Sequence, residues 1–300
     1  MIPNGLHHIT CVTVDAAECV RFYTRLLGLK LIKRTVNQDV PDVWHLFFGD
    51  DRGSAGADLT FFEFRGLPRG IPGAGAAHTI RWRVAGPESL EFWERRLGEA
   101  GVATSLDSGS LSFSDPEGLG HELVAGPWTE EPLTASSAEI PPEHALQGFD
   151  GVRIHSHDPE GEARWLREAM NLSGEGSTAK AEGPSRSATV IYEQAPPSHH
   201  QQGAGSIHHI AWTAFGGNGE MEDWRLKLAR SGVRPTPIID RFWFNAVYFR
   251  APGGLLHEFS TPEPGFTIDE PLETLGTKLV LPPKFEPYRE QIVQRLTPID

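Results

Sequence analysis

The chain opens on Gly5-Leu6-His7-His8-Ile9-Thr10-Cys11-Val12-Thr13-Val14-Asp15, and this stretch recurs in altered form three more times. The other copies begin at His78, Phe149 and Ile207. Each copy starts with the alternation of polar and apolar residues that is typical of a half-buried strand. An internal repeat of this kind predicts several copies of one structural unit.

Each copy continues with a helix and then further strand-like runs. In the first copy the helix is expected over residues 16–28, with Asp15 as the N-cap and Gly28 as the stop. Strands are expected over residues 31–37, 43–49 and 58–64 of that copy. The helices of the later copies are expected over residues 88–100, 159–170 and 221–231. The repeated unit is therefore a β-α-β-β-β module.

The length of 300 residues is sufficient for two domains, each with its own core. We expect an N-terminal domain over residues 1–128, made of modules 1 and 2, and a C-terminal domain over 147–264, made of modules 3 and 4. Residues 129–146 are rich in Pro, Glu, Ser and Thr, which is typical of a linker. Residues 265–300 would form a C-terminal extension.

Four such modules paired into two domains resemble the vicinal-oxygen-chelate superfamily, which includes glyoxalases, bleomycin-resistance proteins and extradiol dioxygenases. The resemblance implies an α+β fold in which pairs of modules form incomplete barrels, each a cup around a metal. It also implies that the ligands come from the first and last strands of modules. The same fold serves lyases, epimerases and metal-free binders, so the residues of the site must decide the function.

The four first strands, aligned on the apolar residue that follows the ligand position, place there His8, Thr79, Gly151 and His209. The last strands of modules 2 and 4 offer Glu122 and Glu258, and module 1 offers Glu63 as a further option. Only modules 1 and 4 hold a histidine, so we expect one metal centre made of His8, His209 and Glu258. Glu122 would then belong to a cup without ligands.

Two imidazoles and one carboxylate are a donor set suited to the Fe(II) of oxygenases, because they leave neighbouring positions open. Mn(II) accepts nearly the same ligands and stays open as an alternative. Familiar catechol-cleaving enzymes take their first histidine from module 3, where this chain has Gly151. A histidine in module 1 resembles the hydroquinone-cleaving branch instead. The resemblance thus implies a ring-cleaving dioxygenase whose partners are a small aromatic substrate, in this branch a hydroquinone, and O2.

The same branch implies roles for polar residues beside the ligands, namely His208, Tyr248, Arg241 and His7, and Thr10 is a further candidate because of its place beside His8. His208 or Tyr248 would take or hold protons. Arg241 would stabilise developing negative charge. Strand alternation places Thr10 on the cup face with His8, and it turns His7 and His208 away from the cup.

Composition excludes several other classes of protein. The formal net charge is −13 and no Lys/Arg cluster occurs, so neither nucleic acid nor an anionic membrane surface is an expected partner. No apolar run is long enough for a membrane span. Two cysteines and an N-terminus without the pattern of a signal peptide make a cytoplasmic protein the expectation. A homo-oligomer is left open.

Two other functions compete with ring cleavage. A glyoxalase-type lyase or isomerase needs two His/Glu pairs in one cup, and Thr79 stands where one of those histidines would be. A metal-free protein that binds a drug or quinone needs no ligand triad, so His8, His209 and Glu258 argue against it.

Overall fold

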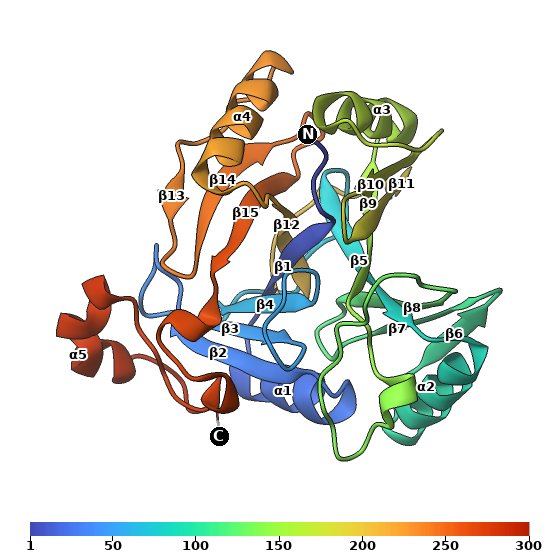
Figure 1. The fold of residues 1–300 in the computed structure, drawn as a ribbon. Helices are drawn as coiled ribbons and strands as arrows, with labels where there is room; N and C mark the ends of the chain where they lie inside the picture. Colours follow the sequence, from blue (N-terminus) through green and yellow to red (C-terminus); the bar gives the residue numbers. More distant parts are fainter. Residues whose placement is uncertain (300) are drawn as a thin grey trace.

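The computed structural model describes residues 1–299 and contains the four expected modules (Figure 1). Module 1 comprises β1 (Leu6–Thr13), α1 (Ala16–Arg21), a π-helical turn (Phe22–Leu26), β2 (Lys30–Val36), β3 (Trp44–Gly49) and β4 (Asp58–Glu63). Module 2 comprises β5 (Ala76–Val84), α2 (Pro87–Glu99), β6 (Thr104–Asp107), β7 (Ser110–Ser114) and β8 (Gly120–Ala125).

The second half of the chain repeats this order with one strand fewer in module 3. Module 3 comprises β9 (Phe149–Ser156), α3 (Pro159–Met170), β10 (Thr178–Glu182) and β11 (Ser187–Gln194). Module 4 comprises β12 (Ser206–Thr213), α4 (Gly217–Arg230), β13 (Ile239–Asp240), β14 (Phe244–Arg250) and β15 (Leu256–Pro264). The expected α+β fold of repeated modules is confirmed, and module 3 is β-α-β-β.

The helix signals in the sequence act where they were expected. The Asp15 carboxylate accepts a hydrogen bond from the Glu18 backbone N–H at 2.9 Å, which satisfies a donor at the start of α1. Gly28 has a φ of +71°, a left-handed conformation that Gly adopts without strain, and the helical segment ends before it. Local sequence therefore determines both ends of this first helical segment.

The strands form two curled sheets, and the modules pair across the two halves of the chain. The eight-stranded sheet has the order β13-β14-β15-β12-β1-β4-β3-β2, which joins modules 1 and 4. The seven-stranded sheet has the order β10-β11-β9-β5-β8-β7-β6, which joins modules 2 and 3. Consecutive modules do not share a sheet, in contrast to the expected grouping of modules 1 with 2 and 3 with 4. The division of the chain into an N-terminal domain (1–128), a linker (129–146) and a C-terminal domain (147–264) remains a proposal, and it describes only the order of the modules along the chain.

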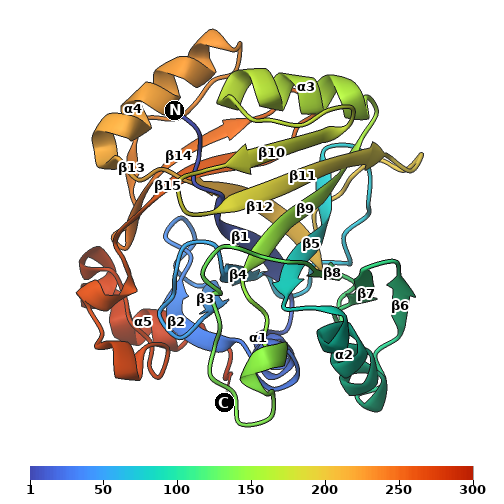
Figure 2. The same cartoon turned by 45° about the vertical axis from the view of Figure 1, so that its right-hand side comes forward.

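Antiparallel pairing of first strands joins the modules of each sheet, β1 with β12 and β5 with β9. Helices α3 and α4 lie side by side at one end of the molecule, and α1 and α2 lie toward the other (Figure 2). The main core fills the space between these helices and the sheets. No helix within residues 1–299 is both long and apolar enough to cross a membrane.

The C-terminal extension packs along β2, the last strand of the eight-stranded sheet. It holds short 3-10 turns at Phe266–Ile268, Leu272–Thr274 and Pro283–Tyr288 and the helix α5 (Arg289–Val293). The buried Lys33 ammonium of β2 contacts the carboxylates of Asp269, at 2.8 Å, and Glu270. A buried charge is tolerated only when it is paired, so these contacts anchor the extension.

Candidate metal centre

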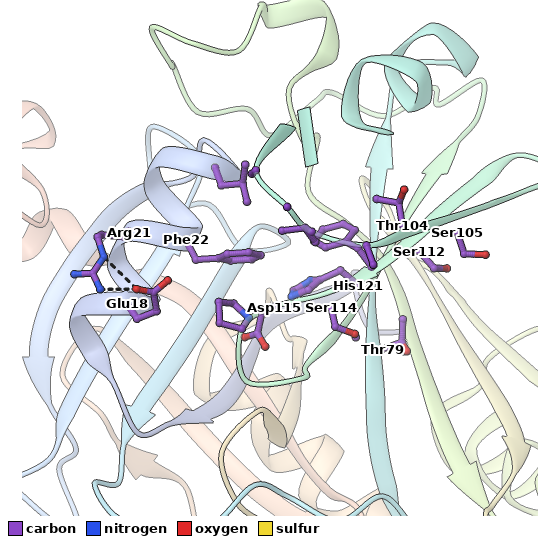
Figure 3. Close-up of a pocket in the computed structure, with 18 of the residues that line it drawn as sticks. Glu18, Arg21, Phe22, Thr79, Thr104, Ser105, Ser112, Ser114, Asp115 and His121 are labelled. Carbon is purple, nitrogen blue, oxygen red and sulfur yellow. Dashed lines mark hydrogen bonds and ion pairs between the residues drawn. The ribbon is translucent and has the colours of Figure 1, made fainter. Parts of the chain in front are cut away.

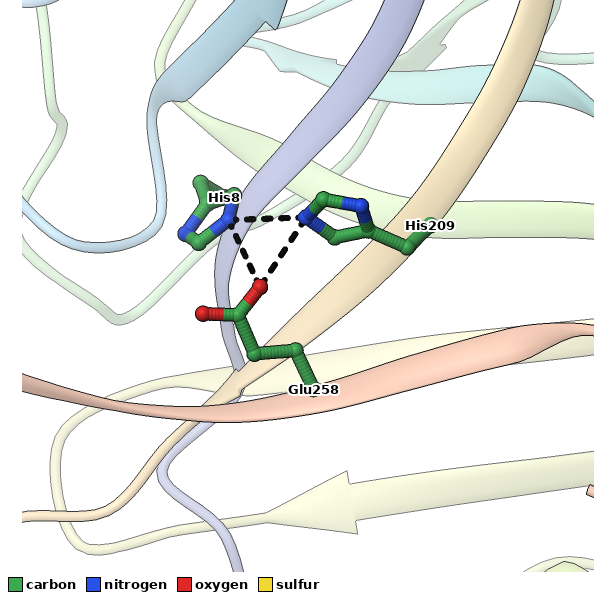
Figure 4. Close-up of side chains that lie close together, drawn as sticks. All are labelled: His8, His209 and Glu258. Carbon is green, nitrogen blue, oxygen red and sulfur yellow. Dashed lines mark hydrogen bonds and ion pairs between the residues drawn. The ribbon is translucent and has the colours of Figure 1, made fainter. Parts of the chain in front are cut away.

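The three predicted ligands come from three neighbouring strands at the centre of the eight-stranded sheet. His8 lies on β1, His209 on β12 and Glu258 on β15, and the sheet order places these strands side by side. Their side chains converge on one point (Figure 4). Residues separated by some 250 positions in the chain therefore meet because modules 1 and 4 share a sheet.

The donor atoms form a compact triangle. Glu258 Oε2 lies 3.3 Å from His8 Nε2 and 2.9 Å from His209 Nε2, and the two imidazole nitrogens are 3.2 Å apart. A first-row metal ion lies about 2.1 Å from its nitrogen and oxygen ligands, so neighbouring ligands of an octahedron are about 3 Å apart. The triangle therefore matches one face of an octahedral site.

The carboxylate of Glu258 is fully buried and has few partners within the protein. Ser260 donates a hydrogen bond to Oε1 at 2.6 Å, but Oε2 has no hydrogen-bond donor among the described residues. Burial opposes its ionisation, yet the imidazoles of His8 and His209 hold the pKa of Glu258 well below its usual value. A buried carboxylate oxygen that faces two ring nitrogens fits a bound cation.

The histidine before each ligand holds that ligand in place. His7 Nδ1 lies 3.0 Å from His8 Nδ1, and His7 Nε2 lies 3.2 Å from the backbone oxygen of Thr261. Burial and the neighbouring imidazole lower the pKa of His7 to about 3, so its ring is neutral. The carbonyl of Thr261 can only accept, so His7 donates from Nε2 and accepts at Nδ1. His8 then carries its proton on Nδ1, which leaves its Nε2 lone pair free for a metal.

The second doublet repeats this arrangement on β12. His208 Nδ1 lies 2.7 Å from His209 Nδ1, and burial together with His209 lowers the pKa of His208 to about 3. Neither His7 nor His208 lines the cavity in front of the ligands. Both histidines lie behind the ligands, so the proton-transfer role expected from sequence for His208 is not what its position favours.

Two β-bulges explain how adjacent histidines come into contact. The register between β1 and β12 shifts between Leu6 and Ile9, and again between Thr10 and Cys11. The first shift takes in His7 and His8, and the second takes in His208. Strict alternation would turn His7 to the opposite face from His8, and a bulge re-aims the side chains locally. His7 therefore contacts His8 through Nδ1 and stays outside the cavity.

A cavity with about 390 Å³ of space between atoms opens in front of the triad. Its wall combines aromatic rings with a few polar groups. The aromatic residues are Phe47, Phe62, Trp243, Phe244 and Tyr248. Apolar walls with few polar groups are typical of sites for small aromatic ligands.

The predicted Tyr248 and Arg241 both line this cavity. Tyr248 on β14 lies directly opposite Glu258 in the strand register, and its ring is 5.9 Å from that of His209. Its hydroxyl accepts a hydrogen bond from Arg241 Nε at 3.3 Å, and Asp39 holds the same guanidinium through contacts of 3.1 and 3.0 Å. Burial and the charge of Glu258 raise the pKa of the phenol, which therefore keeps its proton near neutral pH.

The cavity also contains His45, which the sequence interpretation missed. Its Nε2 lies 3.0 Å from Thr60 Oγ1, and the Thr60 hydroxyl donates to Thr10 Oγ1 at 2.8 Å. Burial and the nearby imidazoles of the triad hold the pKa of His45 well below its usual value. Thr10 thus faces the cup, as expected, and contacts Thr60 there. Alternation along β3 was the overlooked signal, because it places His45 on the face opposite the core residues Trp44 and Leu46.

The module 1 position equivalent to Glu258 is Thr60, because Thr10 pairs with Thr60 just as Ala211 pairs with Glu258. Glu63, the option considered from sequence, instead accepts a hydrogen bond from the Ala16 N–H at the start of α1. The cup therefore offers three ligands, and the fourth that a glyoxalase-type site needs is absent from this position.

The equivalent place in the seven-stranded sheet is filled by ion pairs. Arg81 and Arg153 hold the Glu122 carboxylate through contacts of 3.1 and 2.7 Å. At Gly151 a Cβ atom would lie only 1.7 Å from the backbone oxygen of Thr189, so this backbone leaves no room for a histidine. These contacts agree with the expectation that Glu122 is not a ligand.

A larger hollow of about 1730 Å³ lies over module 2 (Figure 3). Its one histidine, His121, is occupied at both nitrogens, because it contacts Trp82 Nε1 and the Tyr23 hydroxyl at 3.1 Å each. Size alone therefore does not identify the site, and the smaller cavity carries the triangle of donor atoms.

Comparisons with known proteins agree with this assignment of fold. The family model described as "Glyoxalase/Bleomycin resistance protein/Dioxygenase superfamily" matches residues 5–122. The Bacillus subtilis (strain 168) protein named "Putative ring-cleaving dioxygenase MhqO" is 37% identical over 304 residues, covering 99% of this chain and 96% of its own. The "Chlorohydroquinone/hydroquinone 1,2-dioxygenase" of Sphingobium indicum is 30% identical over 316 residues, covering 98% of this chain and 96% of its own.

Solved structures give the same picture. A crystal structure described as a "putative dioxygenase" from Bacillus subtilis matches with a TM-score of 0.92 at 36% identity, covering 100% of this chain and 98% of the other. Glyoxalase I from Zea mays matches with a TM-score of 0.59 at 13% identity, covering 86% of this chain and 92% of the other. At that identity the likeness to glyoxalase I extends to the fold alone.

Proposed function

Since the chain belongs to the glyoxalase/bleomycin resistance protein/dioxygenase superfamily, we propose that it is a ring-cleaving dioxygenase of the extradiol type. In this proposal His8, His209 and Glu258 hold one Fe(II) ion, and the substrates are a hydroquinone and O2. The observation that carries it is the triangle of donor atoms at the wall of an aromatic-lined cavity. Two relatives named "Putative ring-cleaving dioxygenase" and one named "Chlorohydroquinone/hydroquinone 1,2-dioxygenase" match this chain over nearly its whole length, which supports the reaction class.

The donor set supports iron over other common metals. Two imidazoles and one carboxylate on one face of an octahedron are the ligands of non-haem Fe(II) oxygenases, while oxygen-rich sites suit Mg²⁺. When bound, the metal would supply adjacent open positions for a substrate oxygen and O2, and a route for electrons between them. Mn(II) takes nearly the same ligands, so metal analysis of the purified protein decides between the two.

The arrangement of polar groups supports a hydroquinone over a catechol. A catechol has two adjacent oxygens, so chelation by itself orients the ring. A hydroquinone has its oxygens on opposite sides of the ring and offers the metal only one. The protein must then orient the ring, and the aromatic rings of Phe47, Phe62 and Phe244 can hold it from the sides. Tyr248, Arg241 and His45 supply hydrogen bonds and charge within the same cavity.

In this proposal Tyr248 and Arg241 contact the reacting substrate. The Tyr248 hydroxyl is protonated and lies beside the triad, so it can donate a hydrogen bond to a substrate oxygen or pass it a proton. Arg241 is held by Asp39 and keeps its positive charge at the cavity wall, where negative charge on the opening ring would be stabilised. A rigidly held charge costs little reorganisation during the reaction.

The remaining predicted residues are proposed to act through others. His7 and His208 would orient the two ligand imidazoles through their Nδ1 atoms. Thr10 would act through Thr60 on His45, an imidazole that lines the cavity and is not one of the proposed ligands. We therefore assign proton handling to Tyr248 and His45 before His208.

A cytoplasmic location is part of the proposal. The two cysteines, Cys11 and Cys19, are both buried and unpaired, and burial raises the pKa of each thiol well above its usual value. Inert free thiols fit a reducing compartment.

Oxygen uptake tests the proposal directly. Protein loaded with Fe(II) under anaerobic conditions is mixed with a panel of hydroquinones and catechols, and O2 consumption and ring-opened product are followed. We expect hydroquinones to be cleaved faster than catechols. Faster cleavage of every catechol would contradict the substrate assignment, and no uptake with any diphenol would contradict the reaction class.

A further inference from the structure

A second group of metal-binding side chains lies on the seven-stranded sheet. His78 is on β5, His155 on β9 and Glu193 on β11, and these three strands are neighbours. The strand register places His155 opposite Glu193 on one side and opposite Ala76 on the other, two residues from His78. The three side chains therefore form a row across one face of the sheet.

The donor atoms of this row are close enough to share one ion. One nitrogen or oxygen from each side chain lies within 4.8 Å of the others. The rings of His78 and His155 are stacked, with their centroids 3.8 Å apart, and Glu193 Oε2 lies 3.4 Å from His78 Nε2. None of these residues occupies the ligand positions aligned with His8, Thr79, Gly151 and His209, although His78 precedes Thr79 as His7 precedes His8.

Two ring nitrogens of the group lack the partners that buried polar atoms normally have. His78 Nε2 and His155 Nδ1 are inaccessible to solvent and make no hydrogen bond to any described residue. His78 Nδ1 is paired with the Thr79 hydroxyl at 2.9 Å, so Nε2 faces the Glu193 carboxylate at 3.4 Å without a hydrogen bond to it. Native proteins rarely leave such atoms unpaired, and an unpaired ring nitrogen is costly to bury.

We propose that His78, His155 and Glu193 bind a second transition-metal ion, of the Zn²⁺ or Co²⁺ type. Imidazole nitrogens select such ions over Mg²⁺ and Ca²⁺, which prefer oxygen ligands. The stacked rings direct their lone pairs side by side, so one ring turns about its Cβ–Cγ bond when the ion binds. This site does not rest on the ring-cleaving function.

The charges around these three side chains determine how tightly they bind an ion relative to the first site. Arg153 forms an ion pair with Glu193 through Oε1 and leaves Oε2 directed at His78. The Arg153 charge also repels a cation, and Glu193 is more exposed than Glu258. The second ion therefore binds more weakly than the first, and it ties β5, β9 and β11 together.

Metal stoichiometry tests this site. Metal-stripped protein is dialysed to equilibrium against Co²⁺ at neutral pH, and bound metal is counted per chain. We expect two Co²⁺ ions for the wild type, one for His155→Ala and one for Glu193→Gln. His157→Ala is the matched control, because His157 lies just beyond β9, is exposed and belongs to neither group, and it should bind two ions.

Circular dichroism and thermal unfolding establish that each variant is folded. If His155→Ala does not fold, Glu193→Gln decides, because it keeps the shape of a partly exposed side chain. We expect its weaker Co²⁺ site to lose affinity by about tenfold or more, the order seen when a metal site loses a supporting group. A wild type that binds one Co²⁺ ion overturns the proposal, and so does a folded Glu193→Gln that binds two ions as tightly as the wild type.

Discussion

Replacing Tyr248 with Phe removes one hydroxyl group from the cavity and leaves the rest of its wall in place. The hydroxyl accepts one hydrogen bond, from Arg241 at 3.3 Å, and Asp39 holds that guanidinium by two further contacts. Arg241 should therefore keep its position in the variant. The ring should also keep its contact with His209, because the phenyl group is unchanged.

The expected effect on turnover follows from the role proposed for the hydroxyl. Loss of a proton-transfer or hydrogen-bond partner lowers a rate by roughly 10- to 1,000-fold. Each factor of ten corresponds to about 1.4 kcal/mol, so the barrier should rise by about 1.4 to 4 kcal/mol. Metal content should stay at the wild-type level, because the Tyr248 hydroxyl is not one of the three grouped donors.

Steady-state O2 consumption by Fe(II)-loaded protein measures this effect with a hydroquinone as substrate, and metal analysis accompanies each sample. Tyr23→Phe is a matched control, because the buried Tyr23 hydroxyl donates to Asp115 at 3.0 Å outside the cavity. That variant should lose stability and keep turnover per folded, metal-loaded chain. Wild-type turnover in Tyr248→Phe would refute the proposed chemistry, and loss of metal would refute its assignment as a residue outside the ligand set.

Three further predictions concern the metal and the buried charges. His8→Ala, His209→Ala and Glu258→Ala should each bind one metal ion fewer than the wild type and lose activity while circular dichroism stays native, and wild-type iron content in two of them would contradict the triad. Glu122→Gln should leave both metal content and turnover at wild-type values, since arginines already hold that carboxylate, whereas a lost ion would make it a ligand. Burial, and less strongly Asp50, raises the pKa of Asp58, whose two oxygens have no hydrogen-bond partner. The folded state then binds this proton more tightly than the unfolded state, so the carboxyl group destabilises the fold as pH rises above its unfolded pKa. Asp58→Asn should stabilise the protein by about 1 to 3 kcal/mol at neutral pH and by less near pH 4 in thermal unfolding, and an equal gain at both would contradict the shift.

The local pattern of the sequence was sufficient to predict the repeated unit, and the family resemblance then pointed to the proposed ligands. Alternation of polar and apolar residues identified the first strand of each module, and Asp15 and Gly28 marked the ends of the first helix. His8 and His209 could be singled out because only their two modules carry a histidine at that position. These features depend on neighbouring residues, so the sequence contains them directly.

Other features depend on contacts between distant parts of the chain. Whether β1 pairs with β12 or with β5 is decided by how four similar modules pack together, and similar strands do not specify their partner by pattern alone. The bulges that bring His7 onto His8, and His208 onto His209, arise from that same pairing. The role proposed for His45 likewise depends on tertiary structure, because residues of β3 and β14 line the same cavity.

The sequence by itself therefore determined the modules and their helices, and together with the family resemblance it supplied the three side chains that we propose as metal ligands. The tertiary structure decided that modules 1 and 4 build the cup, and that Arg153 closes the equivalent place in the other sheet while His155 leaves a ring nitrogen free beside it. The physical reason is the distance along the chain over which each kind of interaction acts. Propensity and alternation act over a few residues, whereas a metal centre requires donor atoms about 3 Å apart that the chain brings together only when its sheets close.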